Sequence, residues 1–226
     1  MTDGPPVGAN PLEAYFLANE GRLIHKWMHY FDIYHHHLER FRRRPITVIE
    51  LGVFHGGSLQ MWKRYFGPDV RILGVDVNPA CKALEEDQIE IVIGDQADRR
   101  FLRELRERSG PVDVVIDDGG HRMDQQIATF EELFPALVAG GVYLVEDLHT
   151  SYWEEYGGGY RSPGSFIEYA KDLVDQLHGW HSRSEALTVT EHTTQIRGMH
   201  FYDSVLVLDK GSVPEPEVRR TGHASF

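Results

Sequence analysis

The sequence has little of several features that define other classes of protein. Its one cysteine, Cys81, allows no disulfide within the chain and fits a reducing compartment. No apolar run approaches the roughly 20 residues that a membrane-spanning helix needs. Residues 1–11 also lack the basic start and apolar core of a signal peptide. These absences predict a cytoplasmic protein that does not associate with membranes.

Positive charge is scarce too. The chain has 23 Lys and Arg against 35 Asp and Glu, a formal net charge of −12. Binding to nucleic acid phosphates needs clustered Lys and Arg, so a nucleic acid partner is not expected. With 226 residues, 41% of them hydrophobic, the chain can bury one substantial core.

The segment 12–44 has aromatic and charged residues at helical spacing, interrupted near Gly21. This pattern predicts two helices, the second over 24–41. The run His35-His36-His37 looks like a metal tag, but consecutive helical side chains point about 100° apart and cannot converge on one ion. We interpret the run as a solvated or partly packed helical face.

From Ile46 the pattern changes to apolar segments that alternate with amphipathic ones, which is typical of an α/β domain with a mostly parallel sheet and helices on both faces. The predicted strands are 46–51, 71–75, 90–93, 112–117 and 142–146, and the predicted helices are 58–66, 79–86, 98–108, 123–138 and 165–178. Two late strand-like stretches, 186–190 and 201–208, are separated by a turn at Gly198. They would pair antiparallel at one edge and bring the sheet to seven strands. We expect an amino-terminal segment over 1–44, a catalytic domain over 45–210 and a loosely held tail over 211–226.

Ligands of open α/β sheets bind at the carboxyl ends of the strands, and polar residues follow three predicted strands there. The first strand runs into a glycine-containing loop that lets the backbone approach a ligand before a helix begins. Asp76 follows the second strand, where a carboxylate accepts hydrogen bonds from ribose hydroxyls, and Asp95 follows the third, near an adenine or its loop. The predicted cofactor residues of this part of the chain are Glu50, Gly52, Gly56, Ser58, Asp76 and Asp95.

Two details favour S-adenosylmethionine over a nicotinamide cofactor. The glycines Gly52, Gly56 and Gly57 do not have the G-x-G-x-x-G spacing of NAD enzymes. The acid Glu50 introduces the loop, which suits a ligand with a cationic centre rather than a pyrophosphate. A simple tight turn at Gly56-Gly57 is the alternative.

Acidic residues also end the fourth and fifth strands, in Asp117-Asp118-Gly119-Gly120-His121 and Glu146-Asp147. Neighbouring strand ends bring such carboxylates together, where they repel one another unless a cation binds. Oxygen ligands select a hard ion, so we predict Mg²⁺, with Mn²⁺ or Ca²⁺ as alternatives, held by Asp118, Glu146 and Asp147. Asp117 would lie beside the cofactor.

A metal in that place would lower the pKa of a bound hydroxyl, and His121 could accept its proton as general base. The resulting alkoxide would attack the methyl group of S-adenosylmethionine in line. His149 is a candidate second base or substrate contact, or an exposed loop residue. Each acidic pair alone could instead be a turn or a helix cap.

These motifs, with Thr129-Phe130-Glu131-Glu132-Leu133-Phe134-Pro135, Gly140-Gly141-Val142-Tyr143 and the stretch 146–153, resemble the metal-dependent sugar O-methyltransferases of macrolide antibiotic pathways, the mycinamicin rhamnosyl type. The resemblance runs from about His25 to Trp153. It implies a Rossmann-like class I methyltransferase fold with magnesium on Asp118, Glu146 and Asp147 and with His121 as base. It further implies that the segment 25–30, including Lys26 and Tyr30, closes the cofactor pocket.

The chain is shorter than those macrolide enzymes, some of which carry a large amino-terminal extension, so its acceptor and any homo-oligomer stay open. Residues 154–164 could be a mobile lid or a surface loop. We therefore predict an O-methyltransferase that acts on a vicinal diol of a small molecule, such as a deoxysugar of a glycosylated natural product. The alternatives are a catechol acceptor, a NAD-dependent oxidoreductase and a non-catalytic binding protein.

Overall fold

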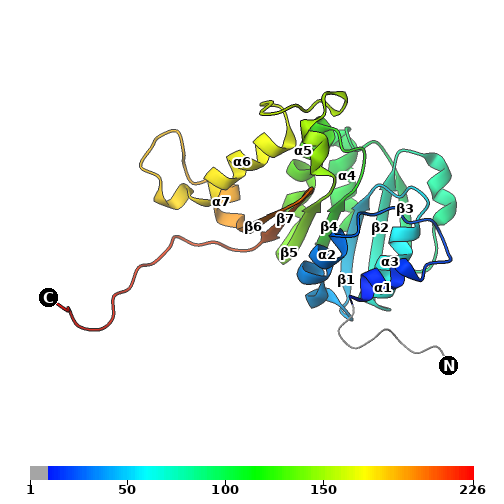
Figure 1. The fold of residues 1–226 in the computed structure, drawn as a ribbon, viewed down its shortest axis with the longest axis horizontal. Helices are drawn as coiled ribbons and strands as arrows, with labels where there is room; N and C mark the ends of the chain where they lie inside the picture. The colour runs from blue at the N-terminus through cyan, green and yellow to red at the C-terminus, as the bar shows by residue number, and fades with distance from the viewer. Residues whose placement is uncertain (1–9) are drawn as a thin grey trace.

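The computed structural model describes residues 10–226 of the chain. Their centre is one seven-stranded sheet, in which the first five strands of the chain run parallel and β7 is antiparallel to both of its neighbours (Figure 1). In spatial order the strands are β3 (Ile89–Ile93), β2 (Val70–Asp76), β1 (Ile46–Leu51), β4 (Val112–Asp117), β5 (Leu137–Val145), β7 (Val205–Lys210) and β6 (Ile196–Tyr202). The predicted fold class is confirmed.

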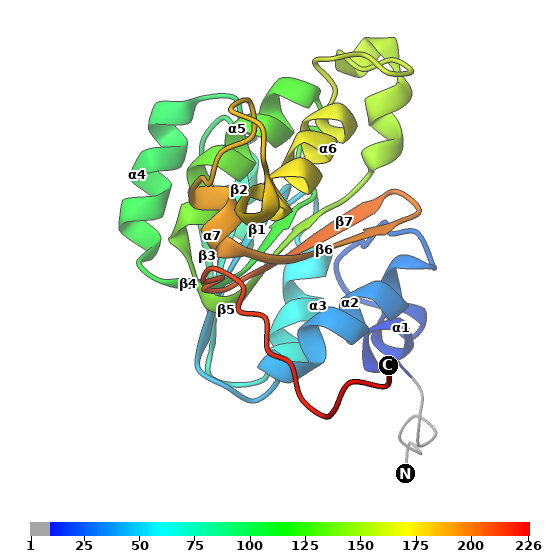
Figure 2. The ribbon, with the colours of Figure 1, turned by 90° about the vertical axis from the view of Figure 1, so that its left-hand side faces the viewer.

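Helices cover both faces of the sheet (Figure 2). One hydrophobic cluster joins one face to α1 (Pro11–Leu17), α2 (Tyr30–Leu38) and α3 (Gly57–Phe66). A second joins the other face to α4 (Arg99–Ser109), α5 (Met123–Leu133) and α6 (Phe166–Leu177). Because both faces are covered, the central strands are mostly apolar and buried along their length, as in Ile-Thr-Val-Ile-Glu-Leu of β1.

The sheet has a topological switch point between β1 and β4. After β1 the chain adds β2 and β3 on one side, and it then returns to place β4 and β5 on the other. The loops that follow β1 and β4 therefore diverge above the sheet and leave a crevice, which is the usual ligand position in open α/β sheets.

The predicted second helix over 24–41 is wrong in its first part. Residues 22–29 form no helix, and α2 begins only at Tyr30 and ends in the 3₁₀ turn η1 (Glu39–Phe41). The backbone of this segment packs against the start of α3, because a Cβ on Gly57 would lie 2.4 Å from the carbonyl oxygen of Arg22. Tertiary contacts thus override the local helical pattern.

Two other boundaries differ in the middle of the chain. The predicted helix 123–138 ends at Leu133, since Pro135 cannot continue it, and β5 begins directly after the 3₁₀ turn η3 (Phe134–Ala136). The predicted helix 79–86 is the 3₁₀ helix η2 (Pro79–Leu84).

The late strands pair antiparallel, but their predicted positions were wrong. Residues 186–190 form no strand, and Gly198 lies inside β6 rather than in a turn. The turn between β6 and β7 is at Asp203-Ser204, where Ser204 has φ +63°, so the predicted strand 201–208 spans it. The short helix α7 (Glu191–Gln195) precedes β6.

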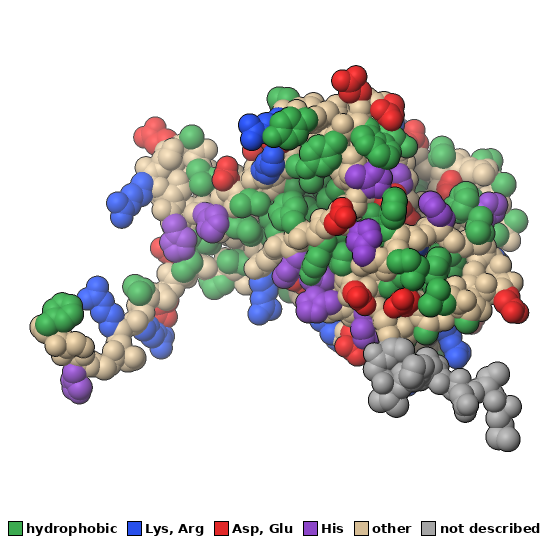
Figure 3. Space-filling model, in the orientation of Figure 1, with side chains coloured by type: hydrophobic (Ala, Val, Ile, Leu, Met, Phe, Trp, Pro, Cys, Tyr) green, Lys and Arg blue, Asp and Glu red, His purple; other side chains and the backbone are tan. Residues whose placement is uncertain are grey.

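The chain ends differ from the packed body. Residues 211–226 contain no helix or strand and project away from the sheet (Figures 1 and 3). The expected flexible start lies outside the described residues up to position 9, and within 10–226 no helix is long and apolar enough to cross a membrane.

Candidate active site

A cavity of about 410 Å³ opens at the carboxyl ends of β1, β2 and β4. Its walls are the loop after β1, the tips of β2 to β5 and part of the segment 22–29. Of the residues predicted from sequence, those that line the cavity are Lys26, Tyr30, Gly52, Ser58, Asp76, Asp95, Asp118, His121, Glu146 and Asp147.

The loop after β1 has a conformation that requires glycine. Gly52 has φ +90°, and a Cβ there would lie 2.0 Å from the carbonyl oxygen of Asp118. The carboxylate of Asp76 holds this loop by accepting hydrogen bonds from the backbone N–H groups of Val53 (2.9 Å) and Phe54 (3.1 Å). Asp76 therefore fixes the loop and also faces the cavity.

Glu50 lies behind the cavity wall rather than on it. Its buried carboxylate accepts hydrogen bonds from Ser58 Oγ and from Trp62 Nε1, both at 3.0 Å. Burial raises the pKa of Glu50 to about 7, although the nearby charge of Lys26 acts in the opposite direction. Glu50 thus anchors the start of α3, while Gly56 (φ +74°) sets the turn before it.

Asp117 is also buried away from the cavity. It accepts a hydrogen bond from Gln96 Nε2 at 2.6 Å, and Gln96 Oε1 in turn accepts one from the backbone N–H of Gly120 at 2.9 Å. Burial raises the pKa of Asp117 to about 7. The pair connects the end of β4 to the loop after β3, where Asp95 faces the cavity.

Three acids and a histidine meet in the cavity at the ends of β4 and β5. His121 Nε2 lies 3.5 Å from Asp147 Oδ2 and 3.8 Å from Asp118 Oδ1. Both His121 (φ +56°) and Asp147 (φ +55°) adopt the left-handed backbone conformation, which is costly for residues other than glycine and is common at functional sites. Thr150 Oγ1 is within hydrogen-bond distance of both of their carbonyl oxygens, at 3.0 and 2.8 Å, so it supports the two strained residues.

Lys26 reaches from the segment 22–29 into this acidic cluster. Its Nζ donates hydrogen bonds to Asp118 Oδ2 at 2.5 Å and to Glu146 Oε2 at 2.7 Å. Burial opposes the charged form of Lys26, but the neighbouring carboxylates outweigh it and hold its pKa well above the ordinary value. Burial and the charge of Asp118 raise the pKa of Glu146. The ammonium group therefore neutralises part of the acidic charge.

Tyr30 and His149 have different positions relative to the cavity. The hydroxyl of Tyr30, the first residue of α2, donates a hydrogen bond to Asp147 Oδ1 at 2.7 Å. His149 does not line the cavity: its Nδ1 lies 2.5 Å from Ser204 Oγ, and its ring packs 4.8 Å from the ring of Trp153. None of residues 154–164 lines the cavity either.

The acidic cluster fits a divalent cation. Ligand atoms of Asp118, His121 and Asp147 all lie within 4.8 Å of one another. Oε1 of Glu146 is buried and has no hydrogen-bond partner among the described residues, so it has a free acceptor position. The carboxylate oxygens of Asp118, Glu146 and Asp147 suit a hard ion, so these residues are compatible with Mg²⁺.

Sequence reasoning missed three residues that hold the site together: Trp62, Gln96 and Thr150. Gln96 directly follows Asp95 at a predicted strand end, so the criterion that selected Asp95 could have found it. Trp62 follows Ser58 by four residues on the same helical face, but its bond to Glu50 depends on tertiary packing.

The known proteins that resemble this chain in sequence and structure include methyltransferases. A family model described as a methyltransferase domain matches residues 49–148. The 8-demethyl-8-(2-methoxy-alpha-L-rhamnosyl)-tetracenomycin-C 3'-O-methyltransferase of Streptomyces olivaceus is 41% identical over 82% of this chain and 50% of its own length. Mycinamicin VI 2''-O-methyltransferase of Micromonospora griseorubida is 33% identical over 82% of this chain and 49% of its own.

A solved structure extends the agreement to three dimensions. The MycE methyltransferase of the mycinamycin biosynthetic pathway, in complex with Mg and SAH, aligns with a TM-score of 0.79 and 31% identity, covering 90% of this chain and 54% of that one. Our chain spans about half the length of the curated relatives it matches.

The sheet order, the antiparallel β7 and the cavity at the switch point place the chain, by fold and sequence similarity, among proteins with the class I S-adenosylmethionine methyltransferase fold. Within that class, it is closely related over most of its length to the sugar O-methyltransferases of the mycinamicin and rhamnosyl-tetracenomycin type. The resemblance noted in the sequence is confirmed.

Proposed function

We propose that this chain transfers the methyl group of S-adenosylmethionine to a hydroxyl of a deoxysugar on a glycosylated natural product, with the help of Mg²⁺. The observation that carries the proposal is that two sets of residues, one suited to a cofactor and one to a metal ion, line two walls of the same cavity. The glycine loop with Asp76 forms one wall, and Asp118, His121 and Asp147 form the other. The relatives named as sugar O-methyltransferases support the choice of acceptor.

The cofactor wall has the groups that a nucleoside with an amino acid tail requires. Asp76 and Asp95 offer carboxylate oxygens for ribose hydroxyls and the adenine side, and Val53, Val75 and Val77 add apolar surface. Gly52 lets the ligand approach the backbone. We assign Glu50 and Asp117 to positioning this wall, because both lie behind it.

The metal would be held by Asp118, Glu146 and Asp147. When bound, Mg²⁺ supplies positive charge that lowers the pKa of a neighbouring hydroxyl. Lys26 and Tyr30, which line the same cavity, donate hydrogen bonds to these acids and hold their orientation. A pair of adjacent hydroxyls on the acceptor would suit such a site.

We assign His121 Nε2 as the acceptor of the hydroxyl proton. The distances of 3.5 and 3.8 Å from Nε2 to the two flanking carboxylates are longer than hydrogen bonds, and the carboxylates would stabilise the imidazolium that forms. As the proton leaves, the acceptor oxygen bonds to the methyl carbon, and the carbon–sulfur bond breaks with its electron pair on sulfur. The products are a methyl ether and S-adenosylhomocysteine.

The test compares His121→Gln with His149→Gln, which removes a histidine near but outside the cavity. We expect His121→Gln to lose about 10²- to 10⁴-fold in kcat, as for removal of a general base, and to bind S-adenosylhomocysteine as the native protein does. His149→Gln should retain most of kcat. Methyl transfer with Mg²⁺ is followed by mass spectrometry. Full turnover of His121→Gln, or turnover unaffected by removal of metal, contradicts the mechanism.

The acceptor class is tested with a panel of deoxysugar glycosides and catechols. A catechol also presents two adjacent oxygens and is the rival acceptor. Methylation of glycosides at a higher kcat/KM than catechols supports the sugar assignment, and the reverse order overturns it.

A further inference from the structure

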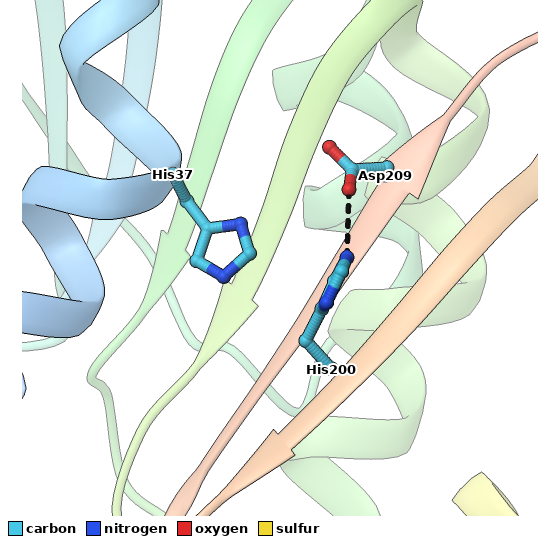
Figure 4. A group of neighbouring side chains, drawn as sticks. All are labelled: His37, His200 and Asp209. Carbon is cyan, nitrogen blue, oxygen red and sulfur yellow. Dashed lines mark hydrogen bonds and ion pairs between the residues drawn. The ribbon is translucent and has the colours of Figure 1, made fainter.

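Two histidines and an acid meet at a second place, away from the cavity, where α2 packs beside the β6–β7 hairpin. Figure 4 shows His37 projecting from α2 toward His200 on β6 and Asp209 on β7. Ligand atoms of the three side chains all lie within 4.8 Å of one another. His200 Nε2 and Asp209 Oδ2 are 3.0 Å apart, and the rings of His37 and His200 are 4.7 Å apart between centroids.

Other groups hold the atoms of these side chains that face away from the cluster. Nε2 of His37 lies 2.9 Å from the hydroxyl of Tyr202, which leaves Nδ1 as the ring nitrogen that can bind a metal ion. Oδ1 of Asp209 accepts a hydrogen bond from Arg40 at 2.7 Å, and Oδ2 faces His200. Metal-binding histidines and carboxylates usually have such outer partners, which fix the tautomer and the orientation of the ligand.

The cluster can be reached from solvent. Gly198, which pairs with Asp209 in the hairpin, adds no side chain beside it, and a Cβ there would be in van der Waals contact with His200 Nε2 at 3.5 Å. His37 is buried, whereas the side chain of His200 is 40% exposed. An ion could therefore enter past His200, and water could complete its coordination.

We propose that His37, His200 and Asp209 form a second metal site, which takes Zn²⁺ or a similar transition metal ion and fastens α2 to the β6–β7 hairpin. Two imidazole nitrogens and one carboxylate oxygen favour Zn²⁺ over Mg²⁺. Zinc with bonds of about 2.0–2.1 Å needs ligand atoms roughly 3.4 Å apart, which rotation of the half-exposed His200 can provide.

This site would connect to the cavity through both elements it joins. Tyr30 at the start of α2 binds Asp147, and Ser204 in the hairpin turn binds His149 and accepts from the backbone N–H of Leu148 at 2.9 Å. A metal that holds α2 and the hairpin together would therefore stabilise the acceptor side of the cavity without touching the substrate.

The experiment measures Zn²⁺ binding to the full chain in excess Mg²⁺, with a chromophoric competitor and with visible absorption of Co²⁺ as a spectroscopic probe. We expect one Zn²⁺ per chain and a higher melting temperature. His200→Gln and His37→Gln should each lose at least about 100-fold in Zn²⁺ affinity, since even loss of an outer partner costs about 10- to 100-fold. Tyr202→Phe, which removes the outer partner of His37, should lose about 10- to 100-fold in Zn²⁺ affinity.

Two controls separate this site from other histidines. His36→Gln changes the neighbour that does not join the cluster and should bind Zn²⁺ as the native protein does. His121→Gln tests for zinc in the cavity and should also retain binding. Absence of stoichiometric binding to the native protein overturns the proposal, as does native affinity in His200→Gln, which stays informative if His37→Gln does not fold.

Discussion

At the scale of single residues, the charge of Lys26 explains how several acids can share one cavity. Its side chain is 2% exposed and joins Asp118 to Glu146, so its charge offsets repulsion that the carboxylates would otherwise feel. The same ammonium opposes the approach of a metal to those oxygens. Lys26 therefore stabilises the metal-free protein and weakens metal binding.

Lys26→Met should accordingly have two opposite effects. Without metal, the free energy of unfolding should fall by about 3–5 kcal/mol, the cost of leaving a buried charge unpaired. Mn²⁺ affinity should rise by roughly tenfold or more, where each tenfold is about 1.4 kcal/mol, because a competing positive charge is gone. Urea denaturation and calorimetric Mn²⁺ titration measure the two quantities.

Lys63→Met is the matched control, since Lys63 pairs with Glu86 at 3.1 Å but is 27% exposed. Its loss should cost about 0–1 kcal/mol and leave Mn²⁺ affinity unchanged. Equal effects of the two substitutions would show that Lys26 is an ordinary surface charge.

Glu50 makes stability depend on pH. Burial raises its pKa from 4.5 to about 7, so the folded state resists ionisation that the unfolded state allows. Its contribution to the free energy of unfolding is complete below pH 4.5 and declines as pH rises toward 7, by up to about 3 kcal/mol. Glu50→Gln should remove this part of the decline and leave the part due to Asp117, whose pKa burial also raises to about 7, while Glu20→Gln, at an exposed position, should keep the whole decline. Denaturation midpoints at several pH values measure both, and parallel profiles for all three proteins would refute the role of Glu50.

The sequence shows which residues lie at strand ends, but it does not show which of them face the cavity. Asp118, Glu146, Asp147 and His121 could be predicted because a strand tip is visible in the sequence and parallel strand tips share one edge. The direction in which each acid faces could not be predicted in this way, because Asp117 and Asp118 are adjacent, yet only Asp118 lines the cavity. That choice depends on the register of β4 with β1 and β5.

At the scale of elements, the non-helical segment 22–29 and the loop after β1 both line the cavity. Helical spacing predicted the segment as part of a helix because its aromatic and charged residues follow that period. Its contacts with α3 and with the acids are long-range and leave no local signal. Likewise, the turn at Ser204 has no glycine to reveal it, whereas the Gly198 that suggested a turn lies within β6.

Gly52→Ala should disrupt the loop through collision as well as backbone strain. Gly140 provides the control, because it has φ +89° but a Cβ there meets nothing within 4 Å. Gly140→Ala should cost about 1–2 kcal/mol from strain alone and keep affinity for S-adenosylhomocysteine. Gly52→Ala should cost more than about 3 kcal/mol and lose most of that affinity, since strain adds to displacement of Asp118. Calorimetry measures the stability and the affinity of each variant. Equal losses of stability in the two variants would contradict a steric collision between a Cβ at position 52 and Asp118.

At the scale of the whole molecule, each face of the sheet has its own hydrophobic cluster, and the cavity lies at the switch point between them. Alternating strand and helix patterns made this architecture predictable, including the antiparallel edge. The acceptor is less accessible to prediction, because the chain spans about half of its relatives' length. The cavity, in contrast, is lined entirely by residues within 23–147.

Cofactor binding should therefore stabilise this chain by itself. A ligand at about a hundred times its Kd adds about 2.7 kcal/mol to the free energy of unfolding, and in a domain of this size 1 kcal/mol corresponds to roughly 2–4 °C. S-adenosylhomocysteine at that concentration should thus raise the melting temperature by about 5–11 °C. NAD should cause no shift, because the loop after β1 lacks the glycine spacing that holds a pyrophosphate. A shift with NAD and none with S-adenosylhomocysteine, followed by differential scanning fluorimetry, would replace the methyltransferase assignment of this cavity with the oxidoreductase alternative.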